Sequence, residues 1–332
     1  MKLENSNGAR EVIIVGGGIA GLSAAIYLGR AQRDALVVDN GKSMAQWEPQ
    51  VQNYLGFPEG VAGEDLLRKG AEQVRNYGVE IIDDEIVSAS RGGKLFHLRG
   101  KVKSYSASRV LLATGLFHLP PKIDGVDQCL GHSMFFCKDC DGFRVQGKTI
   151  LIYGWKNEAV DYALSMLLYS PVVGLTLDAH KPTWDSAHEQ WVREHEIPIY
   201  TQRVIRVRRN DSQIRALVFD DGSEVKLDAL FTTRGDVYFN RLAKDLGARV
   251  DKKGQIEVNE CLATSVQGLY AAGCVTPANC QMIIAAGEGA KAGQAINRDL
   301  FEESLATHQL RRFRRTQVRN TETEPAREPS ER

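Results

Sequence analysis

Two cysteines and an acid stand together in the middle of the chain: Cys137, Cys140 and, directly after, Asp141. Two intervening residues let a cysteine pair open and close a small disulfide ring with little backbone movement, and one thiol of such a pair usually has a depressed pKa and acts as the nucleophile. A zinc site would need a second ligand pair at matching spacing. The other cysteines do not form a clear second ligand pair. We therefore predict a redox-active dithiol, with metal binding or plain packing as the alternatives, and we assign no metal ligand. Those other cysteines are Cys129, Cys261, Cys274 and Cys280.

Asp141 has two interpretations. A carboxylate beside a dithiol can hold and release the proton that moves at each thiol step. Alternatively, Asp141 caps or turns the loop before Gly142.

The elements that position this chemistry begin near the N-terminus. A short apolar strand over Glu11–Val15 runs directly into the glycine-rich turn Gly16–Gly21, a helix is predicted over Leu22–Gly29, and a second strand over Ala35–Asp39. Strand, glycine turn, helix, strand and acid in this order are the dinucleotide-binding unit in its proper context. A merely tight structural turn is the alternative.

Each glycine of that turn has an expected role. Gly16 makes the tight turn, Gly18 lets the backbone touch a pyrophosphate at the helix N-terminus, and Gly21 lets helix and strand pack closely. Asp39 can hydrogen-bond a ribose hydroxyl. We therefore predict a nucleotide site here.

A second unit of the same kind follows the cysteines. It has a strand over Lys148–Tyr153, the turn Gly154–Ala159, a helix to about Tyr169 and a strand over Gly174–Leu177. Its second glycine position holds Lys156, and the bulky Trp155 stands between the two positions, so close approach of the backbone to a pyrophosphate is blocked. The unit either keeps only its fold, or binds something else, or binds the same cofactor in a changed pose.

Further elements are expected around these units. The stretch His118–Pro121 is a stiff break and a candidate interdomain hinge. Beyond it we expect a turn at Gly273–Val275 that leads to a helix over Gln281–Asp299, and a disordered polar tail from Glu302 onward. Its arginine cluster could touch an anionic membrane surface, although a solvated tail is favoured. We also expect a helix over Gly63–Gly78, and strands over Val79–Ser90, Lys94–Leu98, Lys103–Ser106, Val110–Gly115, Val204–Val207, Ile214–Phe219, Glu224–Leu227, Ala229–Thr233, Gly254–Val258 and Gly268–Ala272.

Composition limits the class of protein. The 332 residues are enough for two domains, and 43% hydrophobic and 25% charged residues are ordinary for a soluble protein. A formal net charge of zero gives no reason to expect nucleic acid as a partner. Six cysteines do not make a disulfide scaffold, and no apolar stretch suggests a signal peptide or a membrane span. We expect a cytoplasmic globular protein.

At this point the motifs resemble a family, the low-molecular-weight thioredoxin reductases, over about residues 10–305. The motifs that carry the resemblance are Gly16–Gly21, Asn53–Gly60, Ala113–Gly115, Cys137–Gly142, Gly254–Val258 and Gly268–Gly273.

The resemblance implies an α/β fold with two Rossmann-like, three-layer ββα nucleotide-binding domains, the second inserted into the first. Residues 1–117 and 238–305 would form the FAD domain, 118–237 the inserted NADPH-type domain with the cysteines, and 306–332 a flexible tail. It also implies that Cys140 faces the flavin, Cys137 exchanges with a thioredoxin-like dithiol partner, Asp141 serves as acid and base, and the protein is a homodimer. The implied FAD contacts are Gly16, Gly18, Ala20, Gly21, Asp39, Asn53, Ile86, Thr114, Gly115, Gly273, Cys274 and Gln281.

Four departures from the family pattern concern the cofactors. The second glycine turn is degenerate, and His180 and Lys181 replace the arginines that recognise a 2′-phosphate, for which a bidentate arginine fork is better suited. Lys42–Ala45 replaces the family's flavin-contacting G-G-Q-L. Cys274 stands where the family has an aspartate on the ribityl chain. We expect this cysteine to be a small hydrophobic replacement, with an extra thiol as the alternative.

FAD and the dithiol are thus kept, while ordinary NADPH use is lost. This pattern is similar to ferredoxin-linked thioredoxin reductases, fungal dithiol oxidases and, most of all, the diflavin-linked disulfide oxidoreductases of oxygenic photosynthetic bacteria. The last group implies a second FAD in the vacated site and electrons that run from thiols to flavin. A thioredoxin reductase fed by ferredoxin or another donor, and a flavin-bound redox sensor without turnover, are the alternatives. Candidate contacts for the second nucleotide are Gly154, Trp155, Lys156, Asn157, His180 and Lys181.

Overall fold

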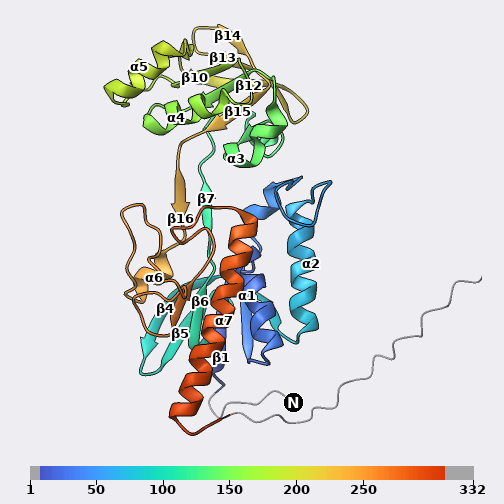
Figure 1. Cartoon of the computed structure of the whole chain (residues 1–332), viewed down its shortest axis with the longest axis vertical. Coiled ribbons are helices and arrows are strands. Elements are labelled where there is room, and N and C mark those ends of the chain that lie inside the picture. The colour runs from blue at the N-terminus through green and yellow to red at the C-terminus, as the bar shows by residue number, and fades with distance from the viewer. Residues whose placement is uncertain (1–7, 311–332) are drawn as a thin grey trace, which may run out of the picture.

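The computed structural model describes residues 8–310, which form two α/β domains joined by a two-stranded ribbon (Figure 1). The ribbon pairs β7 (Leu116–His118) with β16 (Asp236–Tyr238) in antiparallel fashion. One domain is therefore inserted into the other, and the chain crosses between them only twice within the described residues. The stiff break expected at His118–Pro121 lies at the first crossing. The predicted fold class is confirmed.

The first domain is built on a sheet in the order β3-β2-β1-β6-β5-β4, with β17 also paired to β6. Pairs among β3, β2, β1, β6 and β17 are parallel, whereas β4, β5 and β6 form an antiparallel meander. The strands are β1 (Arg10–Val15), β2 (Ala35–Asp39), β3 (Glu80–Asp83), β4 (Ile86–Gly92), β5 (Leu95–Gly100), β6 (Ser104–Leu112) and β17 (Leu269–Ala271). The helices are α1 (Ile19–Arg30), α2 (Gly63–Asn76), α6 (Arg241–Asp245) and α7 (Met282–Ala306).

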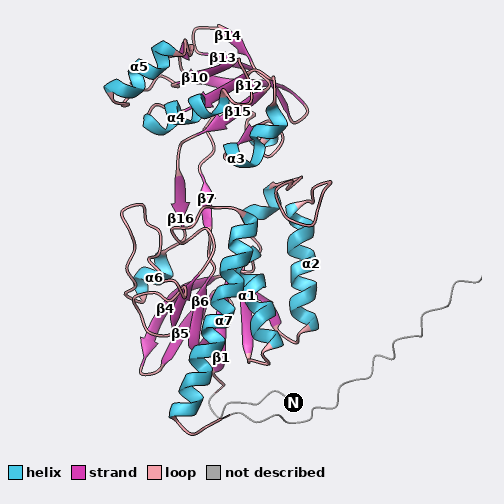
Figure 2. Cartoon of the chain, in the orientation of Figure 1, coloured by secondary structure: helices cyan, strands magenta, loops and turns pink. Residues whose placement is uncertain are grey.

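Alternate residues of β1 serve two cores. Val12 and Ile14 pack with α1 and α7 on one face of the sheet, while Ile13 and Val15 pack with the meander and α6 on the other. Helices α1 and α7 lie side by side because glycines remove side chains at their contact (Figure 2). A Cβ added at Gly289 would lie 2.1 Å from the carbonyl oxygen of Ala20. This close contact fixes the N-terminal end of α7 beside the glycine turn.

The inserted domain has a fully parallel sheet in the order β11-β10-β9-β15-β8, next to the antiparallel meander β12-β13-β14. Its central strands are continuous buried runs, as expected for strands covered on both faces. The strands are β8 (Met134–Phe135), β9 (Ile150–Tyr153), β10 (Val173–Thr176), β11 (Ile199–Tyr200), β12 (Val204–Asn210), β13 (Gln213–Phe219), β14 (Glu224–Lys226) and β15 (Ala229–Thr232). The helices are α3 (Lys138–Asp141), α4 (Asn157–Met166) and α5 (Ser186–Glu194).

Several expectations about elements were wrong. The strands expected separately over Lys103–Ser106 and Val110–Gly115 form one strand, β6. The strand expected over Val79–Ser90 is broken, because the Asp84 carboxylate accepts hydrogen bonds from the amide of Val102 at 3.0 Å and the hydroxyl of Tyr105 at 2.8 Å. Residues 254–258 form no strand, only one isolated bridge at Ile256.

Helix α7 continues to Ala306, beyond both its expected end at Asp299 and the expected start of a disordered tail at Glu302. The reason is Arg109 of β6, whose guanidinium lies 2.6 Å from the Asp299 carboxylate and 2.9 Å from that of Glu303. The expected arginine cluster and the rest of the tail, residues 311–332, lie outside the described residues. Within residues 8–310, no helix has the length and apolar character that a bilayer crossing requires.

Candidate active site

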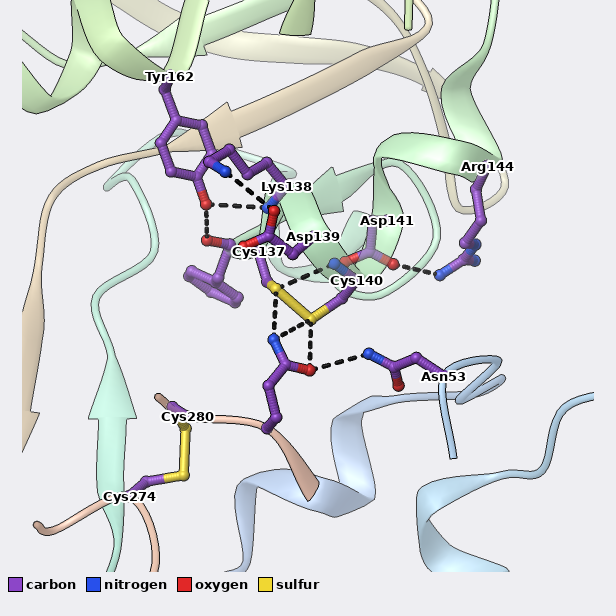
Figure 3. Close-up of a disulfide and its surroundings, with 12 residues drawn as sticks. Asn53, Cys137, Lys138, Asp139, Cys140, Asp141, Arg144, Tyr162, Cys274 and Cys280 are labelled. Carbon is purple, nitrogen blue, oxygen red and sulfur yellow. Dashed lines mark hydrogen bonds and ion pairs between the residues drawn. A yellow bond between two sulfur atoms is a disulfide. The ribbon is translucent and has the colours of Figure 1, made fainter. Parts of the chain in front are cut away.

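Cys137 and Cys140 form a disulfide at the start of α3, on the side of the inserted domain that faces the first domain (Figure 3). We call these two residues the CxxC pair. Cys137 precedes the helix, and its sulfur accepts a hydrogen bond of 3.1 Å from the amide of Cys140. An amide donor favours a thiolate over a thiol. After reduction, Cys137 is therefore the sulfur that this local geometry prepares as a nucleophile.

Tyr162 of α4 fixes the backbone on both sides of Cys137. Its hydroxyl accepts from the amide of Lys138 at 3.0 Å and donates to the carbonyl of Phe136 at 2.7 Å. Burial raises the pKa of this phenol to about 12, so it remains a neutral hydrogen-bonding group. This contact was not predicted, because Tyr162 follows the cysteines by more than twenty residues.

Asp141 is a buried acid, and within residues 8–310 its ion-pair partner is Arg144. Its side chain makes no capping hydrogen bond to the following turn, which argues against the capping alternative. Arg144 lies 2.8 Å from its carboxylate. Burial raises the pKa of Asp141, and the charge and hydrogen bond of Arg144 lower it in part. The result is a carboxyl group able to exchange a proton beside the CxxC pair.

Glu48 supplies a second acid from the other domain. Burial, with a smaller contribution from the charge of Asp141, raises the pKa of Glu48 to about 7, although Arg144 opposes the shift. Glu48 and Asp141 line the same cavity. Sequence reasoning missed Glu48, because a single glutamate in a polar loop carries no pattern that sets it apart.

Gln281 joins the two domains at the disulfide. Its side-chain Nε2 lies 3.3 Å from the Sγ of Cys137 and 3.3 Å from the Sγ of Cys140. Its Oε1 accepts from Nδ2 of Asn53 at 2.8 Å. Gln281, which sequence analysis assigned to a cofactor, thus also contacts the CxxC pair directly, and Asn53 holds it there.

A cavity of about 1400 Å³, including its open mouth, runs between the domains from the glycine turn to the CxxC pair and Asp141. Ten of the expected FAD contacts line it: Gly16, Gly18, Ala20, Asp39, Asn53, Thr114, Gly115, Gly273, Cys274 and Gln281.

Two expected FAD contacts do not line that cavity. A Cβ at Gly21 would lie 1.9 Å from the carbonyl oxygen of Gly16, so this glycine serves helix–strand packing, as its predicted role requires. Ile86 is buried in the core cluster that also holds Phe96 and Leu98 and does not line the cavity, so its expected contact with FAD stays a prediction.

The cavity fits a dinucleotide cofactor. Helix α1 begins at the cavity after Gly18, and no side chain caps its first turn. Its free amide groups are therefore available to an anionic pyrophosphate. Gly16 has φ +107°, and a Cβ there would lie 2.3 Å from the carbonyl oxygen of Ala113. Asp39 accepts from the amide of Gly17 at 2.8 Å at the end of β2, where a ribose hydroxyl would lie.

The second glycine turn has a different geometry. The indole of Trp155 stacks on the ring of His180, with centroids 3.6 Å apart and planes 2° apart. The carbonyl of Trp155 accepts from the amide of Thr183 at 2.7 Å, and the Asn157 side chain donates to the carboxylate of Asp185 at 2.9 Å. These bonds tie the loop after β10 across the turn that a phosphate would need.

The candidate second-site residues are only partly brought together. Trp155 and His180 line a second cavity of about 800 Å³, including its open mouth, whereas Gly154, Lys156, Asn157 and Lys181 do not. A Cβ at Gly154 would lie 2.1 Å from Oγ1 of Thr233, so this glycine is required for packing. The other residues of the second cavity are Lys122, Tyr153, Asp178, Arg203, Val204, Ile205 and Arg234.

Cys274 forms a second disulfide, with Cys280. The expectation that Cys274 is a bland hydrophobic replacement was wrong, and the extra-thiol alternative is nearer to the structure. The chain turns back after Gly273, whose φ is +81°, and brings residue 280 next to residue 274. Spacing alone gave no reason to pair these two cysteines.

A nucleotide cradle whose cavity ends at a disulfide on an inserted second domain defines a thioredoxin reductase-like flavoprotein oxidoreductase. The sequence profile of the pyridine nucleotide-disulphide oxidoreductases matches residues 10–291, and the chain belongs to that family. The resemblance to thioredoxin reductases is confirmed at this level.

Individual relatives agree with this assignment. The chain is 28% identical to a thioredoxin reductase of Treponema pallidum (strain Nichols) over 298 residues, which cover 86% of this chain and 95% of that protein. It is 26% identical to the thioredoxin reductase of Bacillus subtilis (strain 168) over 310 residues, 90% of this chain and 97% of that protein. The crystal structure of HlmI superposes with a TM-score of 0.85 at 28% identity and covers 91% of this chain and 95% of that chain.

Proposed function

We propose that this protein is an FAD-dependent dithiol/disulfide oxidoreductase that passes electrons between the flavin and the CxxC pair without NADPH. The observation that carries the proposal is the contrast between its two nucleotide units. The first opens into a cavity that ends at the CxxC pair, while the turn of the second is covered by Trp155 and tied to Thr183. FAD, when bound, would supply the two-electron redox group that exchanges electrons with the CxxC pair.

The CxxC residues have separate roles in this proposal. Cys137, with its amide donor from Cys140, attacks the disulfide or receives the thiol of a thioredoxin-like partner. Cys140 is the sulfur that would face the flavin. Asp141 takes and returns the proton, and Arg144 keeps its carboxylate available. Net flow from partner thiols to flavin makes the protein a thiol oxidant.

The second cavity supports a second FAD as part of this proposal. It presents three cationic side chains, Lys122, Arg203 and Arg234, and a single acid, Asp178, whose carboxylate is already engaged by Tyr153 and the amide of Val204. Such a lining suits an anionic pyrophosphate, and the Trp155–His180 stack offers an aromatic wall. A 2′-phosphate finds no arginine fork at His180 and Lys181.

Two measurements test the two parts. FAD released from the denatured protein is measured against chain concentration, and the folded protein is mixed anaerobically with either NADPH or a dithiol. We expect close to two FAD per chain, bleaching of the flavin by the dithiol, and none by micromolar NADPH. A ratio near one would contradict the second flavin, and rapid bleaching by NADPH would contradict NADPH independence.

The names of its relatives favour one alternative, a thioredoxin reductase fed by ferredoxin or another donor. That enzyme would reduce a thioredoxin when a photoreduced donor is supplied. The thiol oxidant would instead turn over with dithiol and an electron acceptor. A CxxC pair that changes state but gives no repeated cycles with any acceptor would indicate a flavin-bound sensor.

A further inference from the structure

The second disulfide lines the same cavity as the CxxC pair. Cys274 and Cys280 are both half-buried, both line the cavity, and Gln281, which contacts Cys137 and Cys140, directly follows Cys280 (Figure 3). A small dithiol that enters this cavity therefore meets two disulfides.

The near half of the loop between Cys274 and Cys280 is anchored without the disulfide. The amide of Gly273 donates to the Glu288 carboxylate at 2.7 Å, and the hydroxyl of Thr276 lies 3.0 Å from the same carboxylate. The side chain of Gln255 donates to the carbonyl of Thr276 at 3.0 Å, and Thr276 is fully buried. The position of Cys274 is thus fixed by its neighbours.

The far half of the loop has no such anchors. Pro277 and Asn279 are exposed, and within the described part of the chain the hydrogen bonding of residues 277–280 is limited to the local bond from the Gln281 amide to the carbonyl of Asn279, 2.8 Å. Gln281 then starts α7 without a side-chain cap. The bond to Cys274 is consequently the main constraint on Cys280, whereas Gln281 stands between this bond and α7, which is held to α1 from Ala286 onward.

We propose that Cys274–Cys280 is a second redox-active pair of this site, and that its reduction by a dithiol releases Gln281 from the CxxC pair. One sulfur of the dithiol bonds to a cysteine of the pair while the Cys274–Cys280 bond breaks and the other cysteine leaves as a thiolate and is protonated. The second sulfur of the dithiol then displaces the first cysteine, which takes up a proton. Two electrons and two protons pass from the dithiol to the cysteines. The inference goes beyond the proposed function and does not depend on the direction of flow through the flavin.

The redox part is tested on the full-length flavoprotein under anaerobic conditions. Wild type and C137S/C140S are incubated with graded dithiothreitol, alkylated, and analysed by mass spectrometry of the peptide that holds residues 274 and 280. We expect reduction in the folded protein of both variants, at dithiol concentrations within about tenfold of those that reduce Cys137–Cys140 in wild type. Alkylation of the exposed Cys261 controls for labelling. A bridge that stays oxidised until guanidinium unfolds the protein would be a structural cross-link and would overturn the proposal. If C137S/C140S does not fold, the wild-type protein alone decides the outcome. Mass spectrometry reads the peptide with Cys274 and Cys280 separately from the peptide with Cys137 and Cys140.

The coupling part has its own measurement. The alkylation rate of Cys137 is followed against pH in Cys140→Ser, where Cys137 is free and the Cys274–Cys280 bridge is kept oxidised. The same rate is followed in Cys140→Ser that also carries either C274S/C280S or Gln281→Met. Loss of the Gln281 amide donor removes a group that favours thiolate, so both added changes should move the midpoint to higher pH by up to about one unit. A midpoint that moves with Gln281→Met but not with C274S/C280S would show that the bridge does not position Gln281, and would overturn the coupling.

Discussion

The indole of Trp155 lies parallel to the imidazole of His180, 3.6 Å from it, where the second nucleotide unit would otherwise present an open glycine turn. This pair closes the turn and at the same time forms a wall of the second cavity. The same two residues therefore bear on both cofactors. By closing the turn they oppose the binding of NADPH there, and as part of the second cavity they would contact the proposed second FAD.

Trp155→Ala should lower the affinity for the second FAD by about tenfold, because one aromatic stacking partner is lost. The first FAD should stay, since its cradle lies in the other domain. Released FAD per chain after dialysis measures the change. Trp191→Ala is the matched control, because Trp191 is a half-exposed tryptophan of α5 outside both cavities. An equal loss in both variants would indicate a general effect on the domain.

The two sulfurs of the CxxC pair should differ in their optical signature. With Cys140 on the flavin side, Cys140→Ser should abolish the long-wavelength absorption that a thiolate next to a flavin gives in the reduced protein. Cys137→Ser should retain it. Anaerobic spectra after dithiol reduction measure this difference, and each variant is the control for the other. The opposite pattern would exchange the assigned roles of Cys137 and Cys140.

Arg144→Gln should move the pH profile of dithiol oxidation upward. The guanidinium lowers the pKa of the buried Asp141, against the effect of burial, so its removal lets that pKa rise. The ionised carboxylate then appears at higher pH, and we expect the acidic limb of kcat/KM to shift upward by about one unit. Arg193→Gln is the control, because Arg193 lies on the exposed face of α5 in an i,i+4 ion pair. An unchanged profile in Arg144→Gln would remove Asp141 from the proton step.

Features that depend on neighbouring residues could be predicted from the sequence, whereas features that depend on long-range contacts could not. The strand, glycine turn, helix and acid from Glu11 to Asp39 are contiguous, so sequence alone identified the first cradle. The CxxC pair was found in the same way. By contrast, Gln281 reaches its partners across more than a hundred residues, and Cys280 reaches Cys274 only because Gly273 turns the chain back. The spacing of residues along the chain does not predict such contacts.

The extended α7 shows the same limit. The composition after Glu302 is polar and by itself favours disorder, yet an ion pair from Arg109 on a distant strand continues the helix. Tertiary contacts here override local preference. Glu48 is a further feature that tertiary contacts create, because its pKa rises only when folding buries it.

That burial leads to a prediction about stability. With its pKa raised to about 7 in the folded protein, Glu48 keeps its proton between about pH 4.5 and 7 while the same residue in the unfolded chain loses it. The folded state then binds more protons than the unfolded state, so the free energy of unfolding falls as pH rises through this window. The stabilisation that the bound proton provides is fully present below the pKa that Glu48 has in the unfolded chain, and it is lost above about pH 7.

Glu48→Gln should therefore flatten the pH dependence of stability between about pH 4.5 and 7. Between about pH 4.5 and 7, the free energy of unfolding of the variant should rise by roughly 2–3 kcal/mol relative to that of the parent. This follows from about 1.4 kcal/mol per unit of pKa shift. Denaturant unfolding of the flavin-loaded protein at a series of pH values measures it. Glu302→Gln, at an exposed position of α7, is the control and should follow the parent. Parallel curves for parent and Glu48→Gln would mean that the carboxyl group of Glu48 is solvated in the folded protein and that its pKa is not raised.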